Sequence, residues 1–225
     1  MPLIRRINRL QKELQLRWIK ESRDIGEWSL QRAFYADEGE YRYGAEQETA
    51  APGRLQSQVR ETLFLEAAVQ IPEDWADEKA GIIFKAGGEG LLSINGSPYH
   101  GLDKNRSFVP LTKTLAVSGE LKLSVELYHV PLIPEDPLNG QKDNDAPPVH
   151  FQEARLVTVN PAAESLYFTV TVCLDTLNRL AERSVERLQL EHALEDTILF
   201  IGNPAEADEK RFRQAMLIEL RVFTY

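Results

Sequence analysis

Residues 63–72 read LFLEAAVQIP, and this stretch decides the fold. Every second residue from Leu63 to Ile71 is apolar, and Pro72 ends the run. Such alternation is typical of a β-strand with one buried face. The stretch LKLSVEL at 121–127 repeats the pattern. Two strands of this kind predict a sheet that turns one face toward a hydrophobic core.

Shorter strand candidates surround these two stretches, at Ile82–Phe84, Leu91–Ile94 and Arg155–Val159. Turn signals separate the candidates: Gly87-Gly88, Asn95-Gly96 and Ser118-Gly119. Short strands without helices between them favour antiparallel pairing. The sequence therefore predicts an α+β protein built on an antiparallel, jelly-roll-like β-sandwich over residues 24–160. Residues 131–150, rich in Pro, Asp and Asn, are expected to form a long surface loop.

Helical patterns flank the sandwich on both sides. Apolar residues recur at helical spacing near the N-terminus, at Ile4, Ile7, Leu10 and Leu14. Residues 1–23 are also basic, as transit peptides are, but Glu13 and Glu21 favour an ordinary packing helix. Three helices are expected over 161–225, the second capped by Ser184 and the third beginning near Pro204, with Glu206, Asp208 and Glu209 in its first turns. The chain thus has three predicted parts: 1–23, 24–160 and 161–225.

The composition excludes several classes of protein. The net charge of −9 disfavours non-specific nucleic-acid binding, which relies on Lys and Arg. No apolar run is long enough to span a bilayer, and the single cysteine rules out an intramolecular disulfide framework. We therefore expect a cytoplasmic protein without a membrane or nucleic-acid partner.

Catalytic motifs are absent from the sequence. It has no Gly-x-Ser-x-Gly nucleophile turn, and its four histidines are scattered without His-x-His spacing. Cys173 lies on the apolar side of a predicted helix, as a buried structural thiol would. The 35 acidic residues do not by themselves nominate a glycosidase pair. We expect no catalytic residue and no metal site in this chain.

One segment carries a denser set of polar and aromatic residues. Asn95-Gly96 is a strong signal for a type I′ hairpin turn, because both positions need a positive φ. Tyr99, Asp103 and Arg106 follow within a few residues. Such a group could bind a sugar, with the ring stacking and the ions bonding to hydroxyls. Alternatively, Asp103 and Arg106 pair with each other or with the backbone and hold the loop.

The run EGLLSINGSPYHGLDKNR at 89–106 resembles the N-terminal β-domain of glycoside hydrolase family 38 α-mannosidases, in their cytosolic and bacterial branch. Residues 28–35 are similar to the first strand of that domain, and Ile71-Pro72 with Trp75 to a later strand end. The segment 161–225 resembles the helical linker to the catalytic domain. The likeness extends over almost the whole chain, and its most specific part is 95–106.

The resemblance implies a retaining, metal-dependent α-mannosidase, usually with zinc, in which a separate domain carries a His-x-His-x-Asp motif and an aspartate nucleophile. This chain has no His-x-His. We therefore expect the non-catalytic N-terminal portion of such an enzyme, inactive alone, whose partner is the catalytic domain. Asn95, Tyr99, Asp103 and Arg106 are its predicted contact residues. The alternative is a free-standing carbohydrate-binding module for mannosides. Self-association is a further expectation.

Overall fold

The computed structural model describes residues 3–37, 39–53, 55, 57–129, 150–204 and 206–220, with only the backbone for 217–220. The chain forms two compact units. A helical unit combines residues 1–21 with 158–225, and a β unit contains residues 22–157. The first and last of the three predicted parts therefore belong largely to one unit.

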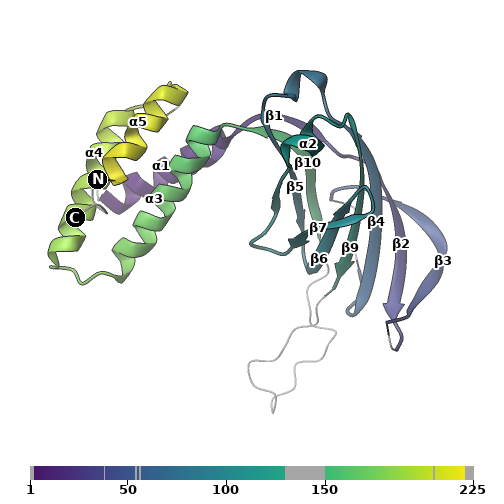
Figure 1. The fold of residues 1–225 in the computed structure, drawn as a ribbon. Helices are drawn as coiled ribbons and strands as arrows, with labels where there is room; N and C mark the ends of the chain where they lie inside the picture. The colour runs from purple at the N-terminus through teal and green to yellow at the C-terminus, as the bar shows by residue number, and fades with distance from the viewer. Residues whose placement is uncertain are drawn as a thin grey trace, which may run out of the picture. The chain divides into compact units, whose positions relative to one another are not determined.

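The described residues form ten strands, five α-helices and one 3₁₀ turn (Figure 1). The helices are α1 (Leu3–Trp18), α2 (Lys113–Ala116), α3 (Pro161–Arg179), α4 (Val185–Ile201) and α5 (Glu209–Leu220), and the 3₁₀ turn is η1 (Glu73–Trp75). The strands are β1 (Ile19–Asp24), β2 (Trp28–Tyr35), β3 (Tyr41–Ala50), β4 (Glu61–Gln70), β5 (Lys79–Ala86), β6 (Glu89–Ile94), β7 (Ser97–Leu102), β8 (Phe108–Pro110), β9 (Glu120–Tyr128) and β10 (Phe151–Val159).

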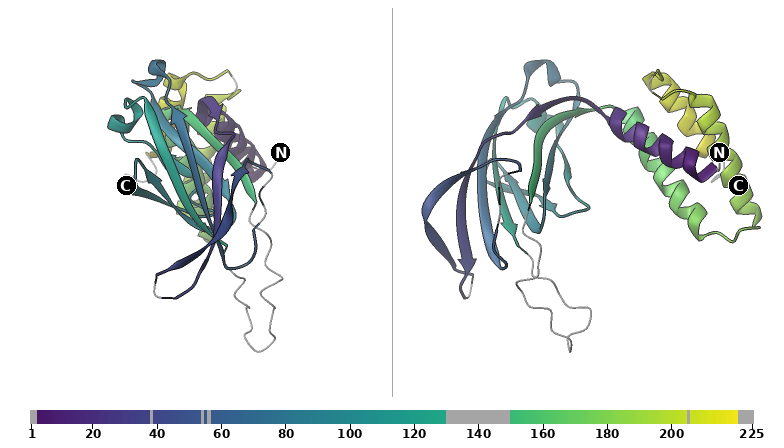
Figure 2. Two further views of the ribbon diagram at one scale, coloured as in Figure 1. Left: turned by 90° about the vertical axis from the view of Figure 1, so that its right-hand side faces the viewer. Right: turned by 180° about the vertical axis from the view of Figure 1, so that it is seen from behind.

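The strands form two antiparallel sheets that face each other in the β unit (Figures 1 and 2). The six-stranded sheet has the order β3-β2-β4-β9-β6-β7, and the four-stranded sheet the order β1-β10-β5-β8. In the larger sheet Leu65 lies opposite Val125, and Leu63 opposite Leu127. This register places the apolar sets of β4 and β9 on the same inner face, because paired residues share a face.

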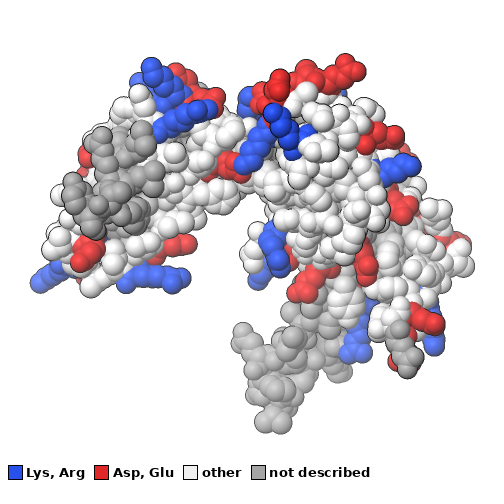
Figure 3. Space-filling model, in the orientation of Figure 1, with Lys and Arg blue, Asp and Glu red and all other residues white. Residues whose placement is uncertain are grey.

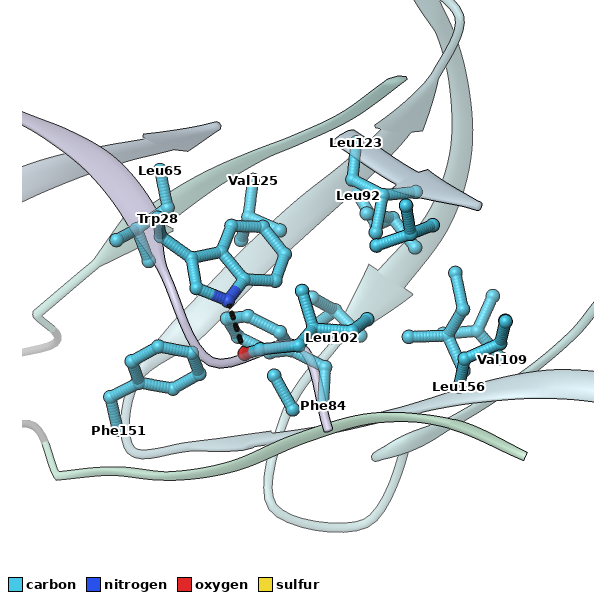
Figure 4. Close-up of a cluster of buried hydrophobic side chains, with 14 of the residues drawn as sticks. Trp28, Leu65, Phe84, Leu92, Leu102, Val109, Leu123, Val125, Phe151 and Leu156 are labelled. Carbon is cyan, nitrogen blue, oxygen red and sulfur yellow. Dashed lines mark hydrogen bonds between the residues drawn. The ribbon is translucent and has the colours of Figure 1, made fainter. Parts of the chain in front are cut away.

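Aliphatic side chains and a group of aromatic rings form the core between the sheets (Figure 4). Trp28 packs edge-to-face on Phe84 and Phe151, with ring centroids 5.5 and 5.9 Å away. All three side chains are almost fully buried. The indole N–H of Trp28 donates to the carbonyl oxygen of Ile25 at 3.0 Å, so its burial leaves no unpaired donor. Each buried ring contributes about 1.5–3 kcal/mol through the apolar surface that it removes from water.

Capping residues fix the ends of the helices in the helical unit. Asn160 accepts hydrogen bonds from two backbone N–H groups at the start of α3, where Pro161 occupies the first helical position. Ser184 accepts from the backbone N–H of Arg187 at 3.1 Å and caps α4, as predicted. Gly202, with φ of +63°, ends α4. These helices therefore begin and end at the residue types that are expected at helix caps.

The first helix packs against helices from the far end of the chain. Within α1 the buried side chains are Ile7, Leu10 and Leu14. Ile4, which the spacing assigned to the same stripe, is 40% exposed. Arg6 forms an ion pair with Glu195 of α4 at 2.8 Å, and Gln11 donates to Thr171 of α3 at 2.8 Å. Helix α1 therefore belongs to the core of the helical unit.

The start of α5 differs from the sequence prediction. The helix begins at Glu209, whereas the pattern placed its start near Pro204. The carboxylate of Asp208 accepts from the backbone N–H of Arg211 at 2.7 Å, as a capping side chain does. Glu206 bonds instead to the side chain of Asn203, outside the helix. Of the three acidic residues, Glu209 therefore lies in the first turn as predicted, whereas Asp208 and Glu206 precede the helix.

The predicted α+β class and the antiparallel sandwich are confirmed. The strand candidates at 63–72, 82–84, 91–94, 121–127 and 155–159 coincide with all or part of β4, β5, β6, β9 and β10. The expected surface loop at 131–150 falls outside the described residues, apart from its last residue.

Candidate functional site

The β6–β7 hairpin carries the predicted type of turn. Asn95 and Gly96 both have positive φ, at 52° and 79°. The side-chain oxygen of Asn95 accepts from the backbone N–H of Lys122 at 2.9 Å, and its own N–H donates to the carbonyl oxygen of Lys122 at 2.8 Å. Asn95 therefore ties the turn to the first residues of β9.

Tyr99 joins β7 to the segment that follows β8. Its hydroxyl donates to the carbonyl oxygen of Pro110 at 2.7 Å and accepts from the backbone N–H of Thr112 at 3.1 Å. The ring packs against the hydrophobic core of the sandwich. Both hydrogen-bonding roles of the hydroxyl are thus occupied within the chain.

Hydrogen bonds between Asp103 and Arg106 close a short loop at residues 103–106, which we call the Asp103 loop. One carboxylate oxygen accepts from the backbone N–H groups of Asn105 and Arg106, at 2.7 and 2.8 Å. The other accepts from the Arg106 guanidinium at 2.7 and 2.8 Å. These bonds, chiefly the one from Arg106, hold the pKa of the Asp103 carboxyl below its ordinary value. The Arg106 side chain is 66% exposed.

The structure thus brings together two of the four predicted contact residues, Asp103 and Arg106, and gives Asn95 and Tyr99 separate partners. All four use polar atoms to hold the backbone around them. A sugar at the Asp103 loop would compete with these internal bonds, and the exposed guanidinium of Arg106 is the group best placed to meet it. Contact of this loop with a sugar or another domain stays a prediction.

The part of the chain that the structure describes contains no set of side chains suited to bind a metal ion. No three His, Cys, Asp or Glu side chains gather there in a way that could hold an ion. Cys173 is buried on α3, as predicted for a structural thiol. His129 is 3% exposed, and its Nδ1 lies 2.7 Å from the Ser57 hydroxyl oxygen. We therefore derive no metal-dependent step from these residues.

A second candidate region lies on the outer face of the six-stranded sheet. It is an aromatic face, defined by Tyr35, Tyr41, Tyr43 and Phe64. The Tyr41 ring contacts those of Phe64 and Tyr35, with centroids 5.1 and 5.6 Å away, and Tyr43 lies 5.5 Å from Phe64. Tyr35 and Tyr43 are 56% and 54% exposed. Sequence reasoning missed this face, although the Tyr41-x-Tyr43 spacing places two rings on one side of a strand.

An acidic side chain anchors the centre of the aromatic face. The Tyr41 hydroxyl donates to a carboxylate oxygen of Glu126 on β9 at 2.5 Å. This hydrogen bond, together with partial burial, raises the pKa of Tyr41 to about 12. The phenol therefore stays protonated to a higher pH than an ordinary tyrosine, and its hydrogen bond joins the ring to β9.

Charged side chains of both signs are interspersed on the surface in view in Figure 3. None of the described helices has the length and apolarity needed to cross a bilayer. The charges on this surface show no extended basic stripe of the kind that follows a phosphate backbone.

The fold defines the class of protein: an antiparallel jelly-roll sandwich with a helical unit. A family model described as "Alpha-mannosidase, jelly roll domain" matches residues 45–157. The chain belongs to this family of α-mannosidase jelly roll domains. No curated protein matches the chain.

Solved structures with some likeness include a β-glucuronidase from an uncultured Clostridium species, at 14% identity and a TM-score of 0.42. The match covers 63% of this chain and 29% of that protein. The β-glucuronidase of Ruminococcus gnavus is 15% identical with a TM-score of 0.40, and the match again covers 63% of this chain and 29% of that protein. The β-glucuronidase of Dictyoglomus thermophilum is 12% identical with a TM-score of 0.34. This match covers 62% of this chain and 28% of that protein. The aligned part thus spans less than a third of each of these proteins.

Proposed function

We propose that this chain is the N-terminal, non-catalytic part of an α-mannosidase of glycoside hydrolase family 38, which hydrolyses terminal α-mannosides when complete. The match of the β unit to an α-mannosidase jelly roll domain carries this proposal. The run at 89–106, through which the chain resembles family 38, builds β6, its turn, β7 and the Asp103 loop. The direct role of the chain is to pack against the catalytic domain and support it.

Exposed apolar side chains on the helical unit support a docking role. Phe168 and Val172 lie one turn apart on α3 and are 50% and 57% exposed. Leu188 and Leu199 of α4 are 49% and 66% exposed. Large apolar side chains gathered at a surface commonly mark an interface. In this proposal the catalytic domain of the same enzyme covers these side chains. When the catalytic domain is absent, we expect the chain to self-associate through them.

In this proposal the catalytic groups of the enzyme lie outside this chain. A retaining glycosidase holds two carboxyl groups about 5–5.5 Å apart, one as nucleophile and one as acid and base. The carboxylates at the sites described here are engaged instead: Asp103 with its own loop and Glu126 with Tyr41. The family's divalent metal, zinc in most members, accordingly lies with the catalytic domain. A cytoplasmic location remains part of the proposal.

An activity assay tests this assignment. The purified chain is incubated with an aryl α-mannoside, with and without added Zn²⁺. We expect no turnover in either case. Metal-dependent turnover by the chain alone would contradict a non-catalytic role. Reading the frame beyond Tyr225 for a His-x-His-x-Asp motif then decides whether the catalytic domain belongs to the same gene.

The alternative function is a carbohydrate-binding module that uses the hairpin and the Asp103 loop. The exposed guanidinium of Arg106 is the observation in its favour. Calorimetric titration with mannose and small mannosides, using the wild type and Asp103→Ala, tests it. Heat from the wild type that disappears in Asp103→Ala supports this alternative, and no heat from either protein contradicts it.

A further inference from the structure

The aromatic face has an ordered place in the six-stranded sheet. Tyr35 pairs with Tyr41 across β2 and β3, and Tyr43 pairs with Ala33 one step along. On the other side of β2, Gln31 pairs with Phe64, which in turn pairs with Glu126 of β9. Because paired residues share a face, these side chains lie together on the outer side of the sheet.

The rings divide into a supporting layer and an exposed layer. Tyr41 and Phe64 are partly buried and meet edge-to-face, with an interplanar angle of 86°. Ala33, which pairs with Tyr43 on the same outer face, is only 1% exposed. Tyr35 and Tyr43 flank them and keep more than half of their surfaces in solvent. The supporting pair is held by the Glu126 hydrogen bond, so the exposed rings rest on a rigid base.

Polar groups and a hollow continue the same face along β4 and β9. Glu66 and Ser124 lie opposite each other one step beyond Phe64 and Glu126, and Ser93 of β6 pairs with Ser124. A shallow hollow of about 590 Å³ is lined by Glu66, Ser93 and Ser124, together with Ala68 and Lys122. Small side chains therefore leave room on this face, next to Phe64 along β4, and hydrogen-bonding groups border that room.

We propose that the aromatic face and this hollow form a binding site for an uncharged oligosaccharide. One face of a pyranose ring presents C–H groups with slight positive charge, and these pack on the negative face of an aromatic ring. Its hydroxyls donate to carboxylates such as that of Glu66, in charge-assisted hydrogen bonds. The Tyr43 ring would stack on one sugar unit, and the hollow would receive a neighbouring unit.

The charges at the site favour an uncharged ligand over an anionic one. Two carboxylates, Glu66 and Glu126, lie within the site, against the single ammonium group of Lys122. An acidic saccharide or a nucleic acid would bring further negative charge to them. The site does not depend on the proposed enzymatic assignment or on the Asp103 loop. It adds a saccharide-binding surface to a domain otherwise assigned a supporting role.

Nuclear magnetic resonance of the full chain tests the site. An α-linked mannotriose, cellotriose and a trimer of galacturonic acid are titrated separately into ¹⁵N-labelled protein. We expect at least one uncharged trimer to shift the amide signals of β2, β3, β4 and β9, and the acidic trimer to leave them in place. No shift with either uncharged trimer up to about 10 mM, the range of very weak binding, would overturn the proposal.

Matched variants locate the contact. Tyr43→Ala removes an exposed ring and is expected to weaken binding about two- to tenfold, from the usual contribution of one aromatic contact. Phe34→Ala is the control, because Phe34 is 44% exposed and its side chain leaves the opposite face of the neighbouring strand, β2. We expect Phe34→Ala to bind as the wild type does. Equal binding by Tyr43→Ala and wild type would overturn the assignment.

Two further outcomes would also count against a saccharide site. Choline tests whether the rings bind a cation instead, through their negative faces. Shifts at the aromatic face with choline and none with the trimers would replace the saccharide by a cationic ligand. Trimer-induced shifts confined to residues 95–106 would transfer binding to the Asp103 loop and overturn the site proposed here.

Discussion

The six-stranded sheet combines a tyrosine with a carboxylate in two places, at Tyr99 and Asp103 in and after its edge strand β7 and at Tyr41 and Glu126 on the aromatic face. In the first pair the hydroxyl and both carboxylate oxygens bond to nearby backbone or to Arg106. In the second region one carboxylate fixes the inner ring, Tyr41, and the outer ring stays exposed. The comparison teaches that a dense local motif can satisfy its polar groups within itself, whereas strands far apart in sequence can together build an exposed aromatic surface.

The largest expected effect comes from breaking the base of the aromatic face. Phe64→Ala removes a partly buried ring that contacts both Tyr41 and Tyr43. We expect the free energy of unfolding to fall by about 2 kcal/mol, less than for a fully buried phenylalanine. Urea denaturation measures this change. Leu91→Ala, on the same face and 40% exposed, serves as control and should cost under about 0.5 kcal/mol. Equal losses in the two variants would show that the rings do not support one another.

A smaller effect is expected at the hairpin turn, where the cost of a substitution comes from backbone conformation rather than from packing. Gly96 has φ of +79° and open space around it, so an added methyl group meets strain but no clash. Gly96→Ala should lower the free energy of unfolding by about 1 kcal/mol. Gly26 has equal space without a positive φ, and Gly26→Ala should cost nothing or stabilise slightly. Thermal unfolding of both variants measures the difference, and identical midpoints would contradict this explanation.

The smallest expected effect concerns pH. Tyr41 has a folded-state pKa of about 12 against an ordinary 10.0, so its contribution to stability is complete below pH 10 and is lost as the pH rises through 12. Glu126→Gln should return this pKa toward 10. Ultraviolet absorbance of the phenolate then shows one of the seven tyrosines titrating earlier. Glu66→Gln changes a carboxylate on the same face and should leave the curve unaltered. A curve for Glu126→Gln that matches the wild type would contradict the assigned cause.

The sequence predicted β4 and β9 through the difference between their two faces. Alternation in β4 and β9 could be read directly because Leu63 and Val125 point to a core while their neighbours do not. Strand β3 gave no such signal, since its residues from Arg42 to Thr49 are exposed on both faces. Its position is set by pairing with β2, which includes a register shift between Gln31 and Ala33. Pairing between distant strands has no local pattern that reveals it.

The candidate sites divide in the same way. The bond between Asp103 and Arg106 could be anticipated, because a spacing of three residues within a turn brings the two side chains together. The aromatic face required the register of β2, β3, β4 and β9, which brings Tyr41 to Glu126 across 85 positions of sequence. Sequence spacing alone cannot specify such a contact, since a shift of one residue would move every side chain to the other face.

The position of α1 in the helical unit has a consequence for synthesis. Its partners, Thr171 and Glu195, leave the ribosome only after the whole β unit has been made. At ordinary rates of translation the delay is on the order of 10 s. The β unit can fold during that interval, while the apolar stripe of α1 waits uncovered and open to chaperones. An N-terminal deletion that spares every strand would leave the helices made last without part of their core.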